Sequence, residues 1–543
     1  MTLSIVPMLC YKRKMKLRAA IIVDQLKVSK WMIDALNEAS DQLEIIYVLN
    51  CVNSKTKRRW IKNFFYYVLN FFSLKNHQTK KQFLPESNAK IFNFESDHIN
   101  NWQIIPDNIT QKLLDKKIEV VIKFGMGLLR IDEKLSQCNV LSFHHGNPTK
   151  YRGRPAGFYE ILNGEKKSGV IVQKLNNELD AGTIYAFAES KVVNYSYKNT
   201  ALNFYSVSKY LLKKAIYNLK NGSQIKISKN GKNHRLPSNL IVLKFVCKII
   251  FKLFKKIIYG LFFEKRWKVA VINNQLKFNG VEVISKSSLK EVPITSNYSL
   301  YADPFFSIDG KLIRLEALNK KSRLGDILEV NLEDMNKQSV IMTDKSKHYS
   351  YPHSFFYDDK EYLMPEVASH SSQYVVSLDS NKESHITIKG LENKKIVDAT
   401  LYQKDGWWYL FFGLKQNAHT VLNLWISSDL CNTFKPHLNS PICISPVKAR
   451  MGGNIKLINN KILRFGQNNE GEYGKSLSIM EIKELTPTSY AETHNGSIFM
   501  ENAKGPHSLN LNPDHSKIVV DYYENKFSFL AGFNRLKAKV QTL

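Results

Sequence analysis

Cysteine is scarce in this chain and does not occur in pairs. The 543 residues contain six cysteines, none of them in a C-x-x-C or other metal-ligand spacing. They are Cys10, Cys51, Cys138, Cys247, Cys431 and Cys443. This scatter excludes a disulfide framework and is typical of a protein kept in a reducing compartment. We therefore expect a cytoplasmic protein, and the sequence gives no sign of a metal.

Acidic residues are under-represented as well. The chain has 78 Lys and Arg residues against 48 Asp and Glu residues, a formal net charge of +30. Such an excess predicts a polyanionic partner, either nucleic acid or an anionic membrane surface. The first predicted strand is not followed by a G-x-G-x-x-G motif. The basic residues near the N-terminus follow the apolar residues Met1–Cys10, whereas in a secretory signal they come first. A dinucleotide site and a signal peptide are therefore not expected.

No apolar run is long and uncharged enough to cross a membrane, which takes about 20 residues. The two candidates are residues 60–74, which include Lys62, and residues 240–263, which include Lys244, Lys248, Lys252, Lys255 and Lys256. Basic, aromatic-rich amphipathic segments favour a peripheral position on an anionic membrane, here its inner face. Packing of each helix on its own domain, with extended lysine side chains, is the alternative.

The length predicts two to four domains. From composition we expect an upstream tail over residues 1–14, an α/β domain over 15–222, a basic linker with an amphipathic helix over 223–266, and a repetitive β-region over 267–543. In the α/β part, apolar strands such as Leu17–Asp24 and Val120–Phe124 alternate with amphipathic helices. This alternation predicts an open, mostly parallel sheet.

One stretch, Val140–Asp180, carries the strongest functional signal. A short apolar strand leads into a loop with His144 and His145, and a second apolar run, Gly169–Gln173, leads into a turn with Asp180. Open α/β sheets build their sites outside the carboxyl ends of their strands. The pattern therefore predicts that His144 and Asp180 meet at one edge of the sheet.

At these residues the chain resembles the N10-formyltetrahydrofolate-dependent formyltransferases, whose pattern is Asn-x-His, then Tyr-Arg-Gly, then Leu-Asp-x-Gly. The matching residues here are Ser142–His144, Tyr151–Gly153 and Leu179–Gly182, and the resemblance covers roughly residues 16–220. It implies the family's α/β fold and N10-formyltetrahydrofolate as formyl donor. It also implies that His144 shuttles protons or holds developing charge and that Asp180 orients its ring.

The family's catalytic asparagine is Ser142 in this chain, so the carboxamide role does not carry over directly. We hypothesise that Asn147 or His145 contacts the oxyanion instead. Arg152 is either an anion-binding residue for a nucleotide-sugar phosphate or a structural partner. The segment that holds the pterin through main-chain groups in the family corresponds to Gly125, Met126, Gly127, Leu128 and Leu129.

The second half repeats at intervals of about 50 residues. Five segments, which start at Ala302, Tyr351, Val397, Met451 and Gly505, each combine an apolar strand, a turn and a second strand. Hairpins repeated in this way predict a five-bladed β-propeller.

This half resembles the arabinanase-type propellers and, more closely, the propeller-like N-terminal region of plant glucosamine inositolphosphorylceramide transferases. Features that carry the resemblance include Ala302–Phe305, Met364–Glu366 and Arg450–Gly453. Candidate pocket residues are Asp303, Glu366, Asp398, Arg450 and His353. Glycan binding, glycoside hydrolysis by converging carboxylates and a structural role are the open alternatives.

Together these features predict a formyltransferase that acts on an amine. The expected amine is that of an amino sugar, carried by a nucleotide or a glycolipid, in surface-polysaccharide synthesis. A methionyl-tRNA formyltransferase-like enzyme would suit the charge, but those enzymes carry a small β-barrel after the catalytic domain, so nucleic acid is not the expected partner. A catalytically weak or inactive glycan-binding protein and a propeller glycosidase are further alternatives. The oligomeric state stays open.

Overall fold

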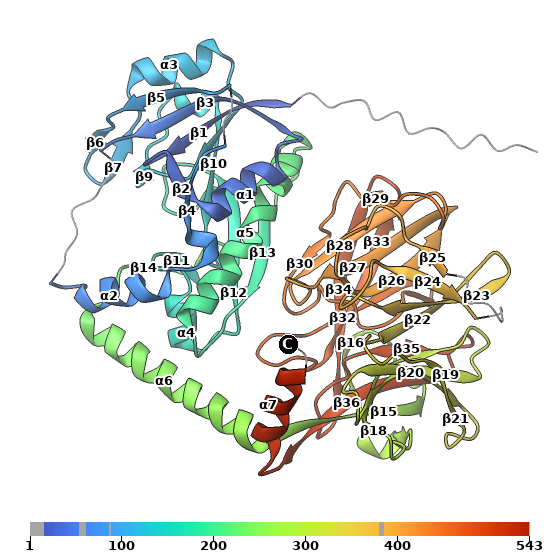
Figure 1. The fold of residues 1–543 in the computed structure, drawn as a ribbon. Coiled ribbons are helices and arrows are strands. Elements are labelled where there is room, and N and C mark those ends of the chain that lie inside the picture. Colours follow the sequence, from blue (N-terminus) through green and yellow to red (C-terminus); the bar gives the residue numbers. More distant parts are fainter. Residues whose placement is uncertain (1–15, 54–60, 86–87, 379–384, 542–543) are drawn as a thin grey trace, which may run out of the picture. The chain divides into compact units, whose positions relative to one another are not determined.

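The computed structural model describes residues 16–53, 61–85, 88–378 and 385–541, the last five of these as backbone only. They form two compact units (Figure 1). The first contains the residues up to 163 with 168–188 and 197–245, and the second contains 164–167, 189–196 and 246 onward. The expected tail over residues 1–14 and the start of the amphipathic segment at Trp60 lie outside the described residues.

The first unit is built on a seven-stranded sheet, which confirms the predicted open, mostly parallel α/β fold. In spatial order its strands are β13 (Thr183–Lys191), β12 (Lys167–Lys174), β10 (Asn139–His144), β8 (Val120–Lys123), β1 (Leu17–Val23), β3 (Leu43–Cys51) and β5 (Lys90–Phe94). The five strands from β10 to β5 are parallel, whereas β12 runs antiparallel to β10. Their apolar residues form two buried clusters, and alternate residues of β1 belong to different clusters, as in a strand covered on both faces.

Amphipathic helices cover the sheet. They are α1 (Lys30–Glu38), α3 (Asp107–Asp115), α4 (Phe158–Asn163) and the long α5 (Tyr197–Lys220), with α2 (Phe64–Ser73) beside them. Trp31 of α1 stacks on Tyr205 of α5 with ring centroids 5.5 Å apart. Short strands complete the unit: β2 (Lys27–Ser29) with β4 (Lys81–Phe83), and β6 (Asp97–Ile99) with β7 (Trp102–Ile104) and β9 (Leu128–Leu129).

The predicted linker is not a linker throughout. Residues Lys232–His234 form β14, which pairs in parallel with β11 (Tyr151–Gly153) inside the first unit. The apolar segment after it forms the predicted helix, α6 (Asn239–Phe262), and the boundary between the units falls within this helix, after Phe245. The expected boundaries at residues 222 and 266 therefore differ from the structural one, because strand pairing draws a polar segment into the α/β unit.

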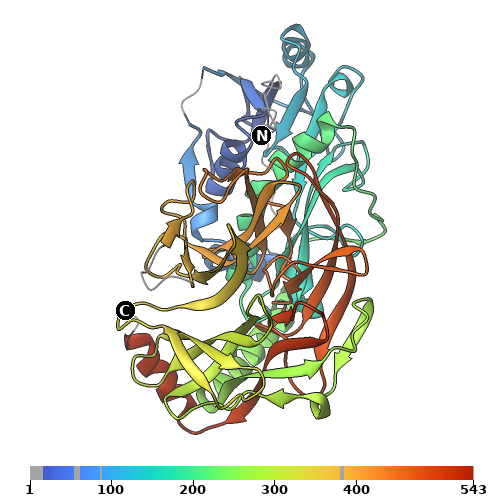
Figure 2. The same ribbon diagram turned by 90° about the vertical axis from the view of Figure 1, so that its right-hand side faces the viewer.

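The described part of the second unit contains five sheets, which Figures 1 and 2 show from green to red. Their strands are β18 (Tyr298–Phe306) to β21 (Gln338–Met342), β22 (Ser350–Tyr357) to β25 (His385–Thr387), β26 (Ile396–Lys404) to β30 (Cys443–Ile444), β31 (Lys456–Ile458) to β34 (Tyr490–Met500) with β16 (Gly280–Ile284), and β35 (Leu509–Leu511), β36 (Lys517–Phe527), β15 (Phe263–Asn273) and β17 (Lys290–Glu291). The helix α7 (Ala531–Gln541) follows.

Each predicted hairpin is present, and each of the five sheets contains one of them. The first strand of the unit, β15, pairs with its last strand, β36, over Phe263–Asn273. Within the described residues, no helix combines the length and apolarity needed to cross a membrane. The five hairpin repeats are thus confirmed, while their arrangement as propeller blades stays a prediction.

Candidate active site

His144 and Asp180 come together as the sequence predicts. His144 ends β10, and its Nδ1 lies 3.4 Å from Asp180 Oδ1, with both side chains largely buried. The path to this contact differs from the expected one. Because β12 is antiparallel to β10, Lys174 at its carboxyl end lies beside Leu141, not beside His144. The loop that follows must therefore bring Asp180 back to the histidine, and Asp180 adopts a positive φ of 47° there.

The Tyr-Arg-Gly strand β11 holds both members of the pair. The main-chain N–H of Gly153 donates to Asp180 Oδ2 at 2.8 Å, and His144 Nε2 lies 3.2 Å from the carbonyl oxygen of Tyr151. A carbonyl only accepts hydrogen bonds, so the ring carries a proton on Nε2. A second proton on Nδ1 would face the Asp180 carboxylate. The two ring nitrogens of His144 thus lie between a main-chain carbonyl oxygen and the Asp180 carboxylate.

Arg152 acts as a brace between loops. Its Nη2 donates to the carbonyl oxygen of Leu179, next to Asp180, and its Nη1 donates to that of Lys229 at 3.2 Å. Of the two roles that the sequence left open, these contacts favour the structural one. In this chain the Tyr-Arg-Gly strand thus holds the Leu-Asp-x-Gly turn in place.

Lys123 is a residue that the sequence reasoning missed. It ends β8 as the register partner of Ser142 on β10, and paired residues of adjacent parallel strands point to the same face of a sheet. Its Nζ donates to the carbonyl oxygen of Met126 at 3.3 Å. Burial lowers the pKa of Lys123 to about 8, although the carboxylates of Asp24 and Asp180 oppose the shift. The signal in the sequence was a lysine that ends an otherwise apolar strand.

The segment predicted to hold the donor's pterin is partly engaged by the protein itself. The N–H of Met126 donates to Asp24 Oδ1, and that of Gly127 donates to Gln103 Oε1. Leu128 and Leu129 form strand β9. A Cβ at Gly125 would lie 2.5 Å from the main-chain nitrogen of Asp24. The absence of a side chain at Gly125 therefore lets the main chain of Asp24 approach closely. Two main-chain N–H groups of the segment are therefore bonded within the protein in this conformation, and its role toward the pterin stays a prediction.

The two proposed substitutes for the asparagine are held in different ways. The Oδ1 of Asn147 accepts from the N–H of Thr149 at 3.0 Å and closes a local turn. The ring of His145 packs among Trp31, Phe204 and Tyr205, its Nε2 is 2.9 Å from Ser208 Oγ, and burial lowers its pKa to about 3. His145 is a neutral core residue between the sheet and α1 and α5. These contacts do not favour His145 as the residue that contacts the oxyanion, whereas the contacts of Asn147 involve only its Oδ1 and its proposed role stays a prediction.

The second unit brings several of its predicted pocket residues together. Arg450 forms a two-pronged ion pair with Asp398, with Nη2 to Oδ1 at 3.1 Å, and the N–H of Asp398 donates to Glu366 Oε2 at 3.0 Å. Burial and the Asp398 carboxylate raise the pKa of Glu366 to about 8, which Arg450 opposes. His353 lies apart from this contact: it is buried, and its ring nitrogens engage Asn454 and the N–H of Leu401.

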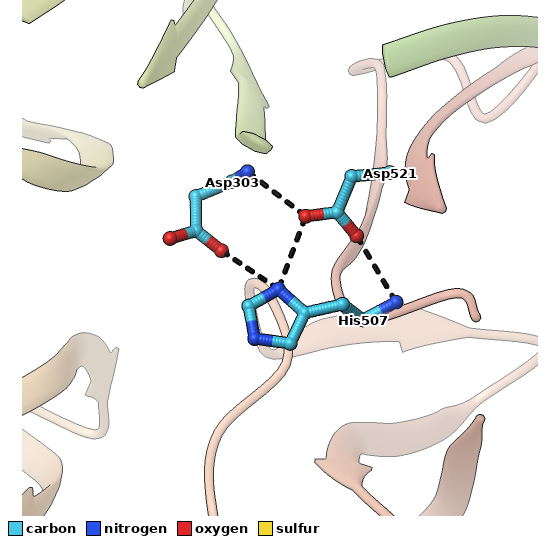
Figure 3. A group of neighbouring side chains, drawn as sticks. All are labelled: Asp303, His507 and Asp521. Carbon is cyan, nitrogen blue, oxygen red and sulfur yellow. Dashed lines mark hydrogen bonds and ion pairs between the residues drawn. The ribbon is translucent and has the colours of Figure 1, made fainter. Parts of the chain in front are cut away.

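Asp303 meets two residues that the sequence did not single out. His507 Nδ1 lies 3.1 Å from Asp303 Oδ1 and 3.1 Å from Asp521 Oδ2, as Figure 3 shows. Asp521 also accepts from the main-chain N–H groups of Asp303, His507 and Ser508. The two carboxylates and Tyr473 raise the pKa of His507 despite its burial. The three side chains each offer one ligand atom, and these atoms lie close enough together to hold a metal ion.

Comparisons with known proteins find relatives of two kinds. The model of the family "Glucosamine inositolphosphorylceramide transferase 1, N-terminal" matches residues 278–527. Glucosamine inositolphosphorylceramide transferase 1 of Arabidopsis thaliana is 28% identical over 267 residues, which are 47% of this chain and 34% of the relative. A methionyl-tRNA formyltransferase of a Sulfurihydrogenibium strain is 30% identical over 99 residues, 18% of this chain and 31% of that protein. The chain thus spans about a third of the length of these curated relatives.

Solved structures of formyltransferases are similar at low levels. An N-formyltransferase from Helicobacter canadensis, in complex with folinic acid and dTDP-3-aminofucose, has 19% identity and a TM-score of 0.26, over 44% of this chain and 82% of its own. A phosphoribosylglycinamide formyltransferase from Anaplasma phagocytophilum has 13% identity and a TM-score of 0.28, over 41% and 96%. TM-scores this low establish no relationship. The chain therefore combines a first unit with formyltransferase motifs and a second unit similar to the N-terminal region of the glucosamine inositolphosphorylceramide transferases.

Proposed function

We propose that this protein transfers a formyl group from N10-formyltetrahydrofolate to an amine, and that the amine belongs to an amino sugar. The observation that carries the proposal is the buried His144–Asp180 pair, held by β11 at the end of the parallel sheet. Its residues match the formyltransferase motifs in type and order, and a curated formyltransferase is similar over part of the chain. The catalytic residues in this proposal are His144 and Asp180, with Lys123 beside them.

Formyl transfer joins the amine nitrogen to the formyl carbon and breaks the bond from that carbon to the donor nitrogen. The amine loses a proton, and the departing nitrogen gains one. His144 can move this proton, and Asp180 stabilises its charged ring. The negative charge that develops on the formyl oxygen needs a donor, which the asparagine supplies in the family and which Ser142 is too short to replace directly.

Lys123 is the residue best placed to stabilise that negative charge. It shares a face of the sheet with Ser142 and His144, and its strand β8 is directly adjacent to their strand β10. Asp24 and Asp180 favour its cationic form electrostatically. A buried ammonium group stabilises an oxyanion more strongly than an exposed one, because the local dielectric constant is lower. In our proposal Lys123 therefore takes over the electrostatic part of the missing carboxamide, with the Ser142 hydroxyl beside it.

An amino sugar is the acceptor that agrees with the second unit. That unit is similar to the N-terminal region of transferases whose name includes glucosamine, and it brings together Glu366, Asp398 and Arg450, residue types that bind sugar hydroxyl and amino groups. We propose that its five sheets form a five-bladed propeller that binds glycan. The donor, a folate of the cytoplasm, agrees with a cytoplasmic location and a role in polysaccharide synthesis.

The test is turnover of N10-formyltetrahydrofolate by the full-length protein with a panel of amino nucleotide-sugars. We expect acceptor-dependent release of tetrahydrofolate and a formylated sugar identified by mass spectrometry. His144→Ala should abolish both, whereas His77→Ala, at an exposed histidine far along the chain, should leave them unchanged. Donor binding without turnover for any amine, including methionyl-tRNA, would show that the first unit only binds folate.

A further inference from the structure

Helix α6 presents a wide apolar surface that the protein leaves uncovered. Nine of its large apolar side chains are exposed: Leu240, Leu243, Ile250, Phe251, Leu253, Phe254, Ile257, Ile258 and Leu261. Only Val242 and Phe245, in its first turns, are buried. Leu240 is 76% exposed and Phe254 is 59% exposed. A soluble protein seldom leaves so many neighbouring apolar side chains in water unless a partner covers them.

The exposed residues lie on one face of the helix. Positions 240, 243, 247, 250, 254, 258 and 261 follow one another at steps of three or four residues, the spacing that places side chains in a single row. With 3.6 residues per turn, most of the exposed apolar side chains fall within roughly a third of the circumference. Cys247, which is exposed, belongs to the same row.

Lysines lie beside this apolar face. Lys244, Lys248, Lys252 and Lys255 form a second row at steps of four and three residues, with Lys256 next to it, and the helix contains no Asp or Glu. At 100° per residue, the lysine row borders the apolar row on one side. Long lysine side chains at the rim of an apolar face can extend their charge toward lipid headgroups while their methylene groups contact the apolar layer.

Helix α2 repeats the pattern next to the start of α6. Its exposed residues are Phe64, Phe65, Val68, Phe71 and Phe72, while Tyr66 on the other face is buried against Phe158. Hydrogen bonds join the two helices at their N-termini: Asn63 Nδ2 donates to the carbonyl oxygen of Pro237 at 2.8 Å, and the N–H of Phe65 donates to Asn239 Oδ1 at 3.1 Å. Both contacts lie within the first unit. Two exposed apolar helices thus share one anchoring point.

We propose that α6 docks on the surface of an anionic lipid bilayer and that the exposed face of α2 binds the same kind of surface. The charge argues for this occupant: an apolar face bordered by lysines and without acids complements an apolar layer covered by anionic headgroups. A second copy of this chain would place the lysine rows of two helices near each other without compensating acids. The surface is separate from the His144–Asp180 site, so the inference does not depend on the proposed activity.

Sedimentation with vesicles tests the proposal with the full-length protein. Vesicles of 70% phosphatidylcholine and 30% phosphatidylglycerol should bind it, and pure phosphatidylcholine vesicles should bind it at least tenfold more weakly. Lys244→Gln with Lys255→Gln should weaken binding to the anionic vesicles about thirty-fold, because each basic residue near such a surface contributes about 1 kcal/mol. The matched control, Lys311→Gln with Lys321→Gln, removes the same charge from exposed positions of the second unit and should change binding far less.

The apolar face is tested separately. Phe251→Ser with Phe254→Ser should weaken binding at least tenfold, whereas Phe356→Ser with Leu457→Ser, at exposed apolar positions on strands, should not. A fluorophore on Cys247, with Cys10 and Cys431 replaced by serine, should shift to shorter wavelength when anionic vesicles are added. Equal binding by both lysine pairs, an unshifted fluorophore, or a dimer that Phe254→Ser dissociates in the absence of lipid would overturn the proposal.

Discussion

The main-chain N–H of Gly153 donates a hydrogen bond of 2.8 Å to Asp180 Oδ2, and the other oxygen of that carboxylate faces His144 Nδ1 at 3.4 Å. Asp180 is thereby fixed from one side and fixes the histidine on the other. Asp180→Asn keeps the shape but removes the charge that stabilises the imidazolium. We expect kcat to fall by about 10²–10⁴, as for other histidine–carboxylate pairs. Steady-state kinetics measure the loss, with Asp41→Asn, a surface substitution, as the control.

Lys123→Met separates activity from stability. If the ammonium stabilises the oxyanion, kcat/KM of the unsubstituted protein declines as the pH rises through about 8, where Lys123 loses its proton. The variant should be at least tenfold slower at pH 7 and should lack this decline. Rates from pH 6 to pH 9.5 provide the measurement. An unchanged profile would remove Lys123 from the mechanism while leaving His144 and Asp180 in it.

The same substitution should raise the melting temperature. Burial lowers the folded-state pKa of Lys123, so the folded protein binds this proton less tightly than the unfolded chain does, and the charged lysine destabilises the fold at pH 7. Stability gained from losing the charge should diminish above pH 8 and vanish near the unfolded pKa, about 10.4. Thermal unfolding of both proteins at pH 7 and pH 10 checks the sign.

Ser142→Asn tests the same site from the other side. It returns the amide that the formyltransferase motif has at this position, on a strand paired in register with Lys123. In the Lys123→Met background the added amide should recover at least part of the lost rate, because either group can donate to the oxyanion. In the unsubstituted protein the gain should be smaller. Single-turnover rates of the four proteins form a double-mutant cycle, and strictly additive effects would contradict a shared role.

The sequence predicts the elements of the first unit well because their patterns are local. The predicted strands Leu17–Asp24 and Val120–Phe124 correspond to β1 and β8, each within one residue. Apolar spacing alone decides such elements. The direction of β12 does not follow from its own residues, since an apolar run reads alike in parallel and antiparallel sheets.

The site is predictable in part for the same reason. His144 and Asp180 are recognisable because motifs keep their spacing, but Lys123 becomes a candidate only when β8 and β10 are placed in register. Likewise, the sequence cannot show that Arg152 donates to the carbonyl oxygens of Leu179 and Lys229, or that the ring of His145 packs in the core. The pairing of β14 with β11 joins residues about 80 positions apart, a contact that no local pattern encodes.

Gly153→Ala should lower the free energy of unfolding more than the same substitution at Gly222. Gly153 has a φ of +80°, and a Cβ there would lie 2.2 Å from the carbonyl oxygen of His234. Gly222 provides the control, because its φ is also positive, +65°, but a Cβ would meet nothing within 4 Å. We expect Gly222→Ala to cost about 1 kcal/mol from backbone strain and Gly153→Ala to cost clearly more. Urea unfolding measures both, and equal losses would mean that β14 moves aside easily.

Glu366 should make the stability of the second unit depend on pH. Burial and Asp398 raise its pKa to about 8, so between roughly pH 4.3 and pH 8 the folded protein holds a proton that the unfolded chain releases. This contribution to stability is complete below pH 4.3 and is lost as the pH rises through 8. Glu366→Gln keeps an oxygen that can accept from the N–H of Asp398 and cannot ionise. Its melting temperature should match that of the unsubstituted protein at pH 5 and exceed it by several degrees at pH 8.5. Glu333→Gln, at an exposed position, should show no such difference, and a gap that stays constant with pH would place the titrating carboxyl elsewhere.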